Sequence, residues 1–296
     1  MKRMPLVGLV DRLEHATALD PLVKSIQKIV GTALRSRSLR DVLHGVPLGH
    51  PVHPLAAQVP LGTWVSAAAL DTVAGTDRAA RLLIGVGVIS ALPTAVAGYA
   101  DWSKMHEQQL RVGVVHSALN LVATSLYAAS FVQRSRGKLT SGKVLSYAGL
   151  MVATGGGFLG GHLTYRQAAG VNHTEDVPHL FPTGWQPLEP LADFADGELE
   201  HRLFDRTSLL VFREGGTVNV LADVCSHLSG PLHEGKIVRA AGTSEGDGPC
   251  VECPWHQSVF SLHTGEVVHG PATTAQPAFD TRIRDGLVEI RLPGAG

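Results

Sequence analysis

Two cysteines and two histidines are spaced in a way that can hold metal. They occur as Cys225-Ser226-His227 and Cys253-Pro254-Trp255-His256, so each half supplies one thiolate and one imidazole. Such a set can build a [2Fe–2S] centre, with two cysteines on one iron and two histidines on the other. On two tight loops, C-x-H and C-x-x-H would each send a Cys to the inner iron and a His to the outer iron.

A zinc site is the alternative for these four residues, because Cys and His also bind zinc. A zinc finger usually pairs Cys with Cys and His with His, whereas here the two types alternate. The alternation favours the iron–sulfur centre. The third cysteine, Cys250, matches no ligand position, and we expect a lone thiol for which a redox role stays open. All three cysteines lie within 29 residues, which excludes a disulfide framework.

The surrounding sequence extends the pattern beyond these four residues. Residues 184–292 resemble the Rieske [2Fe–2S] domain family through VLADVCSHLSGPLHEG, CPWHQSVFSLHTGEVVHGPA and the closing GLVEIRLP. The resemblance implies an antiparallel β-sandwich with a small cluster-binding subdomain, and a third loop at Gly270-Pro271 that covers the cluster. The ligands it implies are Cys225, His227, Cys253 and His256, and the residues it places around the cluster are Ser258, Trp255 and Pro271.

Differences between this sequence and one branch of the family restrict the reduction potential that we expect. Members that oxidise quinols carry a second Cys in each loop, joined as a disulfide. Here Gly230 and Trp255 stand at those positions, so that disulfide cannot form. Phe260 replaces a hydrogen-bonding Tyr of that branch, while Ser258 keeps a hydroxyl that can donate towards a bridging sulfur. Fewer donors lower the reduction potential, so we expect a value below the quinol oxidisers and at or above the ferredoxin type.

Ring-hydroxylating oxygenases also resemble this sequence in their Rieske part. They need a mononuclear iron, held by two His and a carboxylate, on a large domain that follows. Only four residues follow Leu292. We therefore expect an electron carrier or redox subunit that is not an oxygenase by itself.

Short β-rich runs provide the elements that would position the ligands. LLVFR at 209–213, TVNVLA at 217–222 and LVEIRL at 287–292 are bounded by Gly and Asp, which is typical of strands. The Gly-rich stretch at 239–252 lengthens the gap between the two ligand pairs. We expect this stretch to form a surface loop.

Four long stretches before this domain lack charged side chains, and each is close to the ~20 residues that cross a membrane as a helix. A soluble bundle would need a polar outer face, which these stretches lack. Their Gly, Ala and Ser content favours close helix packing in lipid. Trp102, at a helix end, is predicted to be an interfacial anchor. The stretches are Gly49–Leu70, Leu82–Ala100, Val112–Gln133 and Val144–Tyr165.

The predicted organisation is therefore multidomain: a four-helix transmembrane bundle followed by an all-β Rieske-type sandwich. Residues 1–44 form an amphipathic helical segment on the membrane surface or on the bundle. The transmembrane domain spans 45–170, a polar, Pro-rich linker spans 171–183, and the β domain spans 184–292.

The net charge near zero hides a division along the chain. Residues 1–50 carry eight Lys/Arg against four Asp/Glu, and residues 176–296 carry eight against seventeen. No part is basic enough for nucleic acid. With four spans, both termini lie on the same side of the membrane. The Lys and Arg residues near the spans are divided too evenly to indicate which side this is. Because we find no export signal, we expect a bacterial cell membrane protein with its β domain in the cytoplasm.

Histidines of the predicted bundle form a second group. Residues 45–170 resemble an uncharacterised family of bacterial membrane proteins, through GHPVHPLAAQVPLG at 49–62, Asp101 and His116. Up-and-down connectivity places His53, His116 and His162 at one membrane face. Imidazoles from different helices can hold a b-type haem or a metal, and a quinone site is a further option. Histidines that only cap helix ends are the alternative.

The main hypothesis is a membrane-anchored iron–sulfur protein that carries single electrons between unidentified partners, a redox protein or a quinone. The exposed edges of His227 and His256 would pass the electron. One alternative is a haem- or quinol-linked oxidoreductase with the bundle as its second redox site. The other is a redox sensor without turnover. The sequence does not fix the oligomeric state.

Overall fold

The computed structural model describes residues 5–239 and 248–293. The chain divides into two compact units. The helical unit comprises Met1–Leu39 and Pro51–Ala169, and the β-rich unit comprises Arg40–His50 and Gly170–Gly296. Most of the predicted surface loop at 239–252 falls on residues 240–247, which lie outside the described residues.

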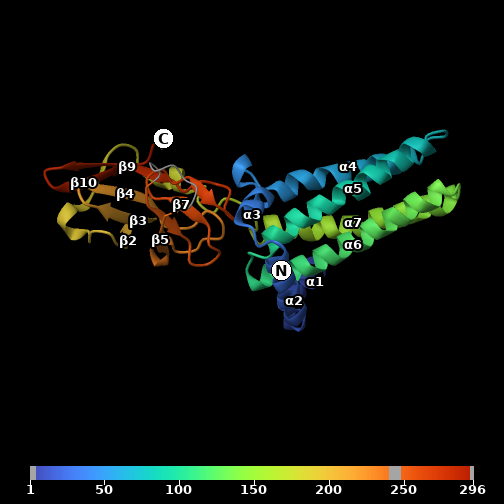
Figure 1. Cartoon of the computed structure of the whole chain (residues 1–296), viewed down its shortest axis with the longest axis horizontal. Helices are drawn as coiled ribbons and strands as arrows, with labels where there is room; N and C mark the ends of the chain where they lie inside the picture. The colour runs from blue at the N-terminus through green and yellow to red at the C-terminus, as the bar shows by residue number, and fades with distance from the viewer. Residues whose placement is uncertain (1–4, 240–247, 294–296) are drawn as a thin grey trace. The chain divides into compact units, whose positions relative to one another are not determined.

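Four long helices dominate the helical unit and run side by side (Figure 1). They are α4 (Val52–Leu70), α5 (Asp77–Trp102), α6 (Glu107–Ser135) and α7 (Leu139–Tyr165). Each of α5, α6 and α7 contains one predicted span, whereas α4 begins three residues after the predicted start at Gly49. Three of them, α5, α6 and α7, are long and apolar enough to cross a membrane. The shorter α4 has 19 residues. The hydropathy of this region is lower because it contains His53, Gln58 and three prolines, of which Pro51 precedes the helix.

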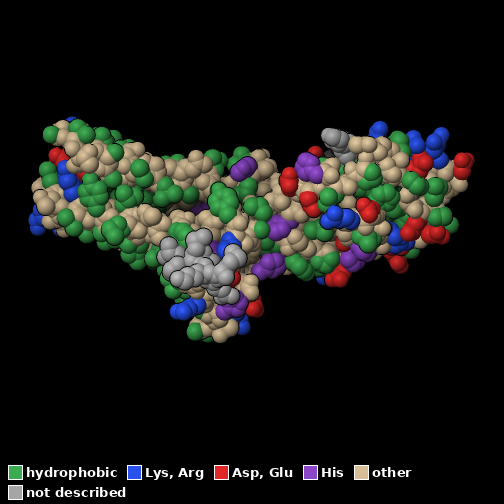
Figure 2. Space-filling view, turned by 180° about the vertical axis from the view of Figure 1, so that it is seen from behind, with side chains coloured by type: hydrophobic (Ala, Val, Ile, Leu, Met, Phe, Trp, Pro, Cys, Tyr) green, Lys and Arg blue, Asp and Glu red, His purple; other side chains and the backbone are tan. Residues whose placement is uncertain are grey.

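The outward surface of these helices is apolar. Large side chains such as Leu82, Ile89 and Met151 are more than half exposed, at 66%, 72% and 78%. Figure 2 shows hydrophobic side chains along the long helices, with charged ones mostly at the helix ends and on the β-rich unit. A continuous apolar surface of this kind is unfavourable in water and matches lipid chains. The helical unit is a membrane domain.

A buried ion pair joins three helices inside the bundle. Asp71 follows α4, and its carboxylate accepts a hydrogen bond from Arg134 Nη1 at 2.8 Å. Both side chains are fully inaccessible to solvent. Arg134 Nη2 also donates to Ser146 Oγ at 3.0 Å, and Lys143 Nζ donates to the Asp71 carbonyl at 3.1 Å. The pair therefore ties the end of α4 to α6 and α7.

The N-terminal segment folds as α1 (Pro5–Glu14) and α2 (Asp20–Ala33), followed by α3 (Arg37–His44). Trp102 packs in a core cluster with Val23 of α2, and its Nε1–H donates to the Leu110 carbonyl at 3.0 Å. The expectation that Trp102 anchors the chain in the interface is wrong, because its side chain is only 5% exposed.

Two antiparallel sheets form the β-rich unit, which confirms the predicted fold class. The six-stranded sheet has the order β1-β10-β9-β4-β3-β2 and the four-stranded sheet the order β5-β6-β7-β8. The first sheet consists of β1 (Gln186–Pro190), β2 (Leu199–Phe204), β3 (Thr207–Glu214), β4 (Thr217–Ala222), β9 (Ala278–Arg284) and β10 (Leu287–Arg291). The second consists of β5 (Lys236–Val238), β6 (Cys250–Glu252), β7 (Val259–Ser261) and β8 (Val267–His269).

The end of the predicted linker takes part in the core of this unit. A short helix, α8 (Val177–Leu180), leads into Phe181, which is 4% exposed. The Phe181 ring packs against Phe204 and Phe279, with ring centroids 5.0 Å and 4.8 Å apart. The buried Leu209, Val220 and Ile290 belong to the same cluster. The core therefore begins before the first strand.

The Asp71–Arg134 pair gives a test of the bundle. Asp71→Asn leaves the Arg134 guanidinium buried without its counter-charge, and we expect a loss of about 3–5 kcal/mol of unfolding free energy. Equilibrium unfolding in detergent micelles would measure it. Asp77→Asn is the matched control, because Asp77 pairs with Lys143 at a partly exposed site, where a loss below ~1 kcal/mol is expected. Equal losses for both variants would contradict the structural role of the pair.

Candidate metal centre

The first candidate ligand loop, Cys225–Gly230, lies between β4 and β5. Two backbone hydrogen bonds close it: the Cys225 N–H donates to the Gly230 carbonyl and the Ser229 N–H donates to the Cys225 carbonyl, both at 2.9 Å. Ser229 has a φ of +63°, a left-handed conformation that turns the chain back. The closure holds Cys225 and His227 on one tight turn.

The second loop, Cys253–Ser258, lies between β6 and β7 and repeats this closure. The Cys253 N–H donates to the Ser258 carbonyl at 2.8 Å and the Gln257 N–H donates to the Cys253 carbonyl at 3.1 Å. Gln257, at the position equivalent to Ser229, has a φ of +68°. The two loops are therefore local copies of one turn, with the His at the third residue of the first and the fourth residue of the second.

The four predicted ligands come together as two inner thiols and two outer imidazoles. Cys225 and Cys253 are 1% and 2% exposed, and their side chains hydrogen-bond to each other. His227 and His256 are partly exposed, and their ring centroids lie 5.1 Å apart. The inner and outer placement is what the two motifs predict for one thiolate pair and one imidazole pair.

Hydrogen bonds around the thiols favour the thiolate form at one of them. The hydrogen bond from Cys225, together with the N–H groups of Trp255 and His256, lowers the pKa of Cys253 to about 7, although burial acts in the opposite direction. The same thiol–thiol contact and burial raise the pKa of Cys225. Thiolate is the form that binds metal, so part of the site is already organised for a cation.

The donor set fits a two-iron centre. Among the described residues, no three His, Cys, Asp or Glu side chains converge as they would around a single ion. A structural zinc site needs four such ligands, whereas each iron of a mixed Cys/His [2Fe–2S] centre takes only two from the protein. Gly230 belongs to this fit, because a Cβ there would lie 2.8 Å from Cys253 Sγ and 3.2 Å from the Trp255 ring.

A third loop, Gly270–Gln276, connects β8 to β9 and bonds to the second loop. The Ala272 N–H donates to Ser258 Oγ at 2.9 Å. No contact among the described residues uses the Ser258 hydroxyl hydrogen, so it can point towards a cluster sulfur. Pro271 is buried beside Ala272, and Trp255 is 48% exposed. Ser258 and Pro271 are therefore buried on the second and third loops, and their contact with the cluster stays a prediction.

Gln276 ties the third loop to the first. Its Oε1 accepts the Ser226 N–H at 2.7 Å, and its Nε2 donates to the carbonyls of Ala222 and Val224, each at 2.8 Å. The Gln276 side chain is buried at 2% exposed. The sequence analysis missed this residue, because a Gln outside the ligand motifs carries no signal of its own.

Asp41, on α3, supports the third loop from a distant part of the chain. Its carboxylate accepts His269 Nδ1–H at 2.8 Å and the Gly270 N–H at 3.0 Å. The buried His44 lies close by, 3.3 Å from where a Cβ on Gly270 would be. The segment 40–50 therefore packs against the third loop. Asp41 belongs to no motif, so the sequence gives no sign of this contact.

Comparison with known proteins identifies the β-rich unit. A family model described as "Rieske [2Fe-2S] domain" matches residues 184–280. The ferredoxin subunit of anthranilate 1,2-dioxygenase from Burkholderia cepacia is 33% identical over 108 residues, which are 36% of this chain and 92% of that protein. The chain belongs to the Rieske [2Fe-2S] family. Its Rieske domain binds a [2Fe–2S] cluster, which supplies a one-electron couple.

Further matches cover both units. The ferredoxin subunit of 3-phenylpropionate/cinnamic acid dioxygenase from Escherichia coli K12 is 31% identical over 106 residues, 36% of this chain and 92% of that one. The solved Sphingomonas yanoikuyae B1 ferredoxin is 26% identical, with a TM-score of 0.31, and covers 37% of this chain and 100% of its own. A family described as "Predicted membrane protein (DUF2231)" matches residues 49–173.

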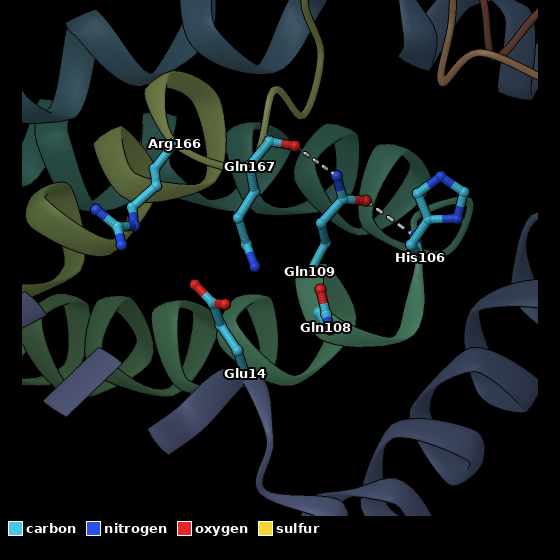
Figure 3. A pocket seen from close by; sticks show the side chains of 6 residues that line it. All are labelled: Glu14, His106, Gln108, Gln109, Arg166 and Gln167. Atoms are coloured by element: carbon cyan, nitrogen blue, oxygen red, sulfur yellow. Dashed lines mark hydrogen bonds between the residues drawn. The ribbon is translucent and has the colours of Figure 1, made fainter. Parts of the chain in front are cut away.

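The structure separates the three predicted membrane histidines. The rings of His53 and His116 lie together, with centroids 6.3 Å apart. His162 instead holds Glu14, with 2.7 Å between Nε2 and Oε1. Glu14 also lines a polar pocket of about 300 Å³ (Figure 3). The other residues lining this pocket are His106, Gln108, Gln109, Arg166 and Gln167.

Replacing either kind of ligand tests the assignment of the Rieske centre. Cys225→Ser or His256→Ala should abolish the EPR signal of the reduced cluster, because each change leaves one iron with a missing ligand. Cys250→Ala is the matched control: Cys250 is buried in β6 and belongs to neither ligand loop. EPR of dithionite-reduced, full-length protein in detergent measures the result. A cluster signal that survives in either ligand variant would overturn the assignment.

The Ser258 hydroxyl gives a second test. Ser258→Ala should lower the reduction potential, because a donor to the reduced cluster is lost. A hydrogen bond of ~0.5–1.5 kcal/mol corresponds to roughly 20–60 mV for one electron. The control is Ser261→Ala, three residues further on in β7, whose hydroxyl accepts the Thr264 N–H. An EPR-monitored redox titration compares them, and equal potentials for wild type and Ser258→Ala would exclude this role.

Proposed function

We propose that this protein is a membrane-anchored carrier of single electrons whose cluster exchanges them through His227 and His256. The observation that carries the proposal is the layered site: both thiols are buried and both imidazoles are partly exposed. An imidazole edge at the surface shortens the path to a partner, while the buried side excludes water. The membrane domain anchors the carrier to the bilayer.

The named relatives support a protein partner. Two are ferredoxin subunits of dioxygenases, and we propose by analogy that this Rieske domain docks on a reductase, an oxidase or an oxygenase. Trp255 is 48% exposed next to His256, with ring centroids 6.4 Å apart. An exposed Trp beside the outer ligand suits the apolar centre of a small, transient interface.

A quinol-linked oxidoreductase is a second candidate, favoured by the polar pocket of the helical unit. The side-chain Nε2 and Oε1 of Gln167 are buried there without a partner among the described residues. Glu14 lines the same pocket and bonds to His162. An amide that can donate to a quinone oxygen and a carboxylate–imidazole pair that can accept a proton are the groups a quinol site needs.

Two electron donors distinguish these functions in the full-length protein reconstituted in nanodiscs. With NADH and a flavoprotein ferredoxin reductase, we expect rapid reduction of the cluster. The rate should be severalfold slower in Trp255→Ala, because this variant has a smaller apolar surface on which the reductase can dock. Stopped-flow absorbance measures both rates. The control is Leu203→Ala, an exposed apolar residue on β2.

Decylubiquinol as the only donor tests the second candidate. Reduction by this quinol that is slowed in Glu14→Gln and unchanged in Glu107→Gln would favour it over the carrier. If neither donor reduces the cluster while dithionite does, both functions are wrong and a sensor without turnover gains support.

A further inference from the structure

His53 and His116 meet inside the bundle from two helices that are not neighbours. His53 is in the first turn of α4 and His116 is in α6, whereas the extensive helix contacts are α4 with α5, α5 with α6, and α6 with α7. The rings are 6.3 Å apart between centroids and nearly perpendicular, at 83°. Both rings are partly buried. Two imidazoles therefore face the interior between the helices.

Each ring is fixed in one tautomer by a backbone carbonyl. His53 Nδ1 lies 3.0 Å from the Thr94 carbonyl on α5, and His116 Nδ1 lies 2.8 Å from the Gly156 carbonyl on α7. A carbonyl only accepts, so Nδ1 must carry the proton in both rings. In the neutral ring Nε2 then holds an unprotonated lone pair. An Nδ1–H bound to a carbonyl is the usual support of a histidine whose Nε2 ligates a metal.

Asn120 is the other polar neighbour of His116, and it does not occupy that lone pair. Asn120 Nδ2 lies 3.2 Å from His116 Nε2 and 3.4 Å from His116 Nδ1. An atom on the Nε2 lone-pair axis would be much farther from Nδ1 than from Nε2. The nearly equal distances place the amide off that axis, and it donates to the His116 carbonyl at 2.9 Å.

Glycines on α5 and α7 make the room for these rings. A Cβ on Gly98 would lie 2.7 Å from His53 Nδ1, and a Cβ on Gly160 would lie 3.2 Å from His116 Cε1. A Cβ on Gly156 would lie 2.7 Å from Asn120 Oδ1. Any larger residue would push the ring from its carbonyl. Glycines on α5 and α7 therefore leave the space that the two imidazole rings occupy.

The other histidines of this unit have different surroundings. His162 holds the Glu14 carboxylate, and His106 caps the start of α6. In the described part of the chain, no third His, Cys, Asp or Glu joins His53 and His116. Zinc sites take three or four protein ligands, so two imidazoles suit a metal whose remaining ligands come from elsewhere. Haem iron, with four ligands from its macrocycle, and copper, which imidazole binds strongly, are such metals.

We propose that His53 and His116 form a metal site in the membrane domain, with their Nε2 atoms as ligands to a haem iron or a copper ion. The site is separate from the Rieske cluster in both residues and chemistry. It does not depend on which partner the Rieske domain serves. Histidines in a membrane domain are costly and are usually retained for a function of this kind.

Full-length Cys225→Ser protein tests the proposal, because it lacks the cluster and its iron. It is expressed with supplied haem precursor and, separately, titrated with Cu(I) under anaerobic conditions after purification in detergent. We expect either a Soret band with a pyridine haemochrome, or a stoichiometric copper site by elemental analysis. His53→Ala and His116→Ala in this background should weaken binding by roughly tenfold or more.

His162→Ala is the matched control, since it removes a membrane histidine without touching the pair, and binding should be unchanged. Asn120→Ala should also retain the metal. Thermal melts followed by circular dichroism identify any variant that fails to fold. If the histidine variants do not fold, metal binding by the Cys225→Ser parent still tests the proposal. If the folded Cys225→Ser parent binds neither haem nor copper, or if the metal persists in both His53→Ala and His116→Ala, the proposal is wrong.

Discussion

The sulfur atoms of Cys225 and Cys253 lie side by side in the interior of the Rieske domain, and much of that unit is arranged around them. As ligands of a cluster, both would be thiolates. Like charges at close range repel strongly where water is excluded. The structure opposes this with N–H groups directed at the sulfurs from the residues just after Cys225 and Cys253. Those N–H groups are in place because each ligand loop is closed by the same two backbone hydrogen bonds.

The same requirement explains the shell around the loops. Gln276 joins the third loop to the first, and Ser258 joins it to the second. Asp41 holds the third loop from outside. These hydrogen bonds connect the three loops to one another and to α3.

The membrane domain obeys a different constraint. Lipid offers no hydrogen bonds, so each polar group inside the bundle needs a partner in the protein. Arg134 meets this condition with Asp71, and His53 and His116 meet it with the carbonyls of neighbouring helices. The Rieske unit is built from chain on both sides of α4–α7, since Arg40–His50 belongs to it together with the residues after 169. The two units are therefore joined by more than one passage of the chain.

The sequence alone predicted the two-domain organisation and the cofactor, and it named the four candidate ligands that the structure brings together. It could do so because ligand spacing, apolar length and strand patterning are local properties that survive in one dimension. Tertiary structure alone decided that Trp102 is buried, that His53 pairs with His116 while His162 pairs with Glu14, and that Asp41 and Gln276 support the third loop. Asp41 and His269 are 228 residues apart in the chain. Contacts of that kind follow from how helices and loops pack in three dimensions, and no local pattern records them.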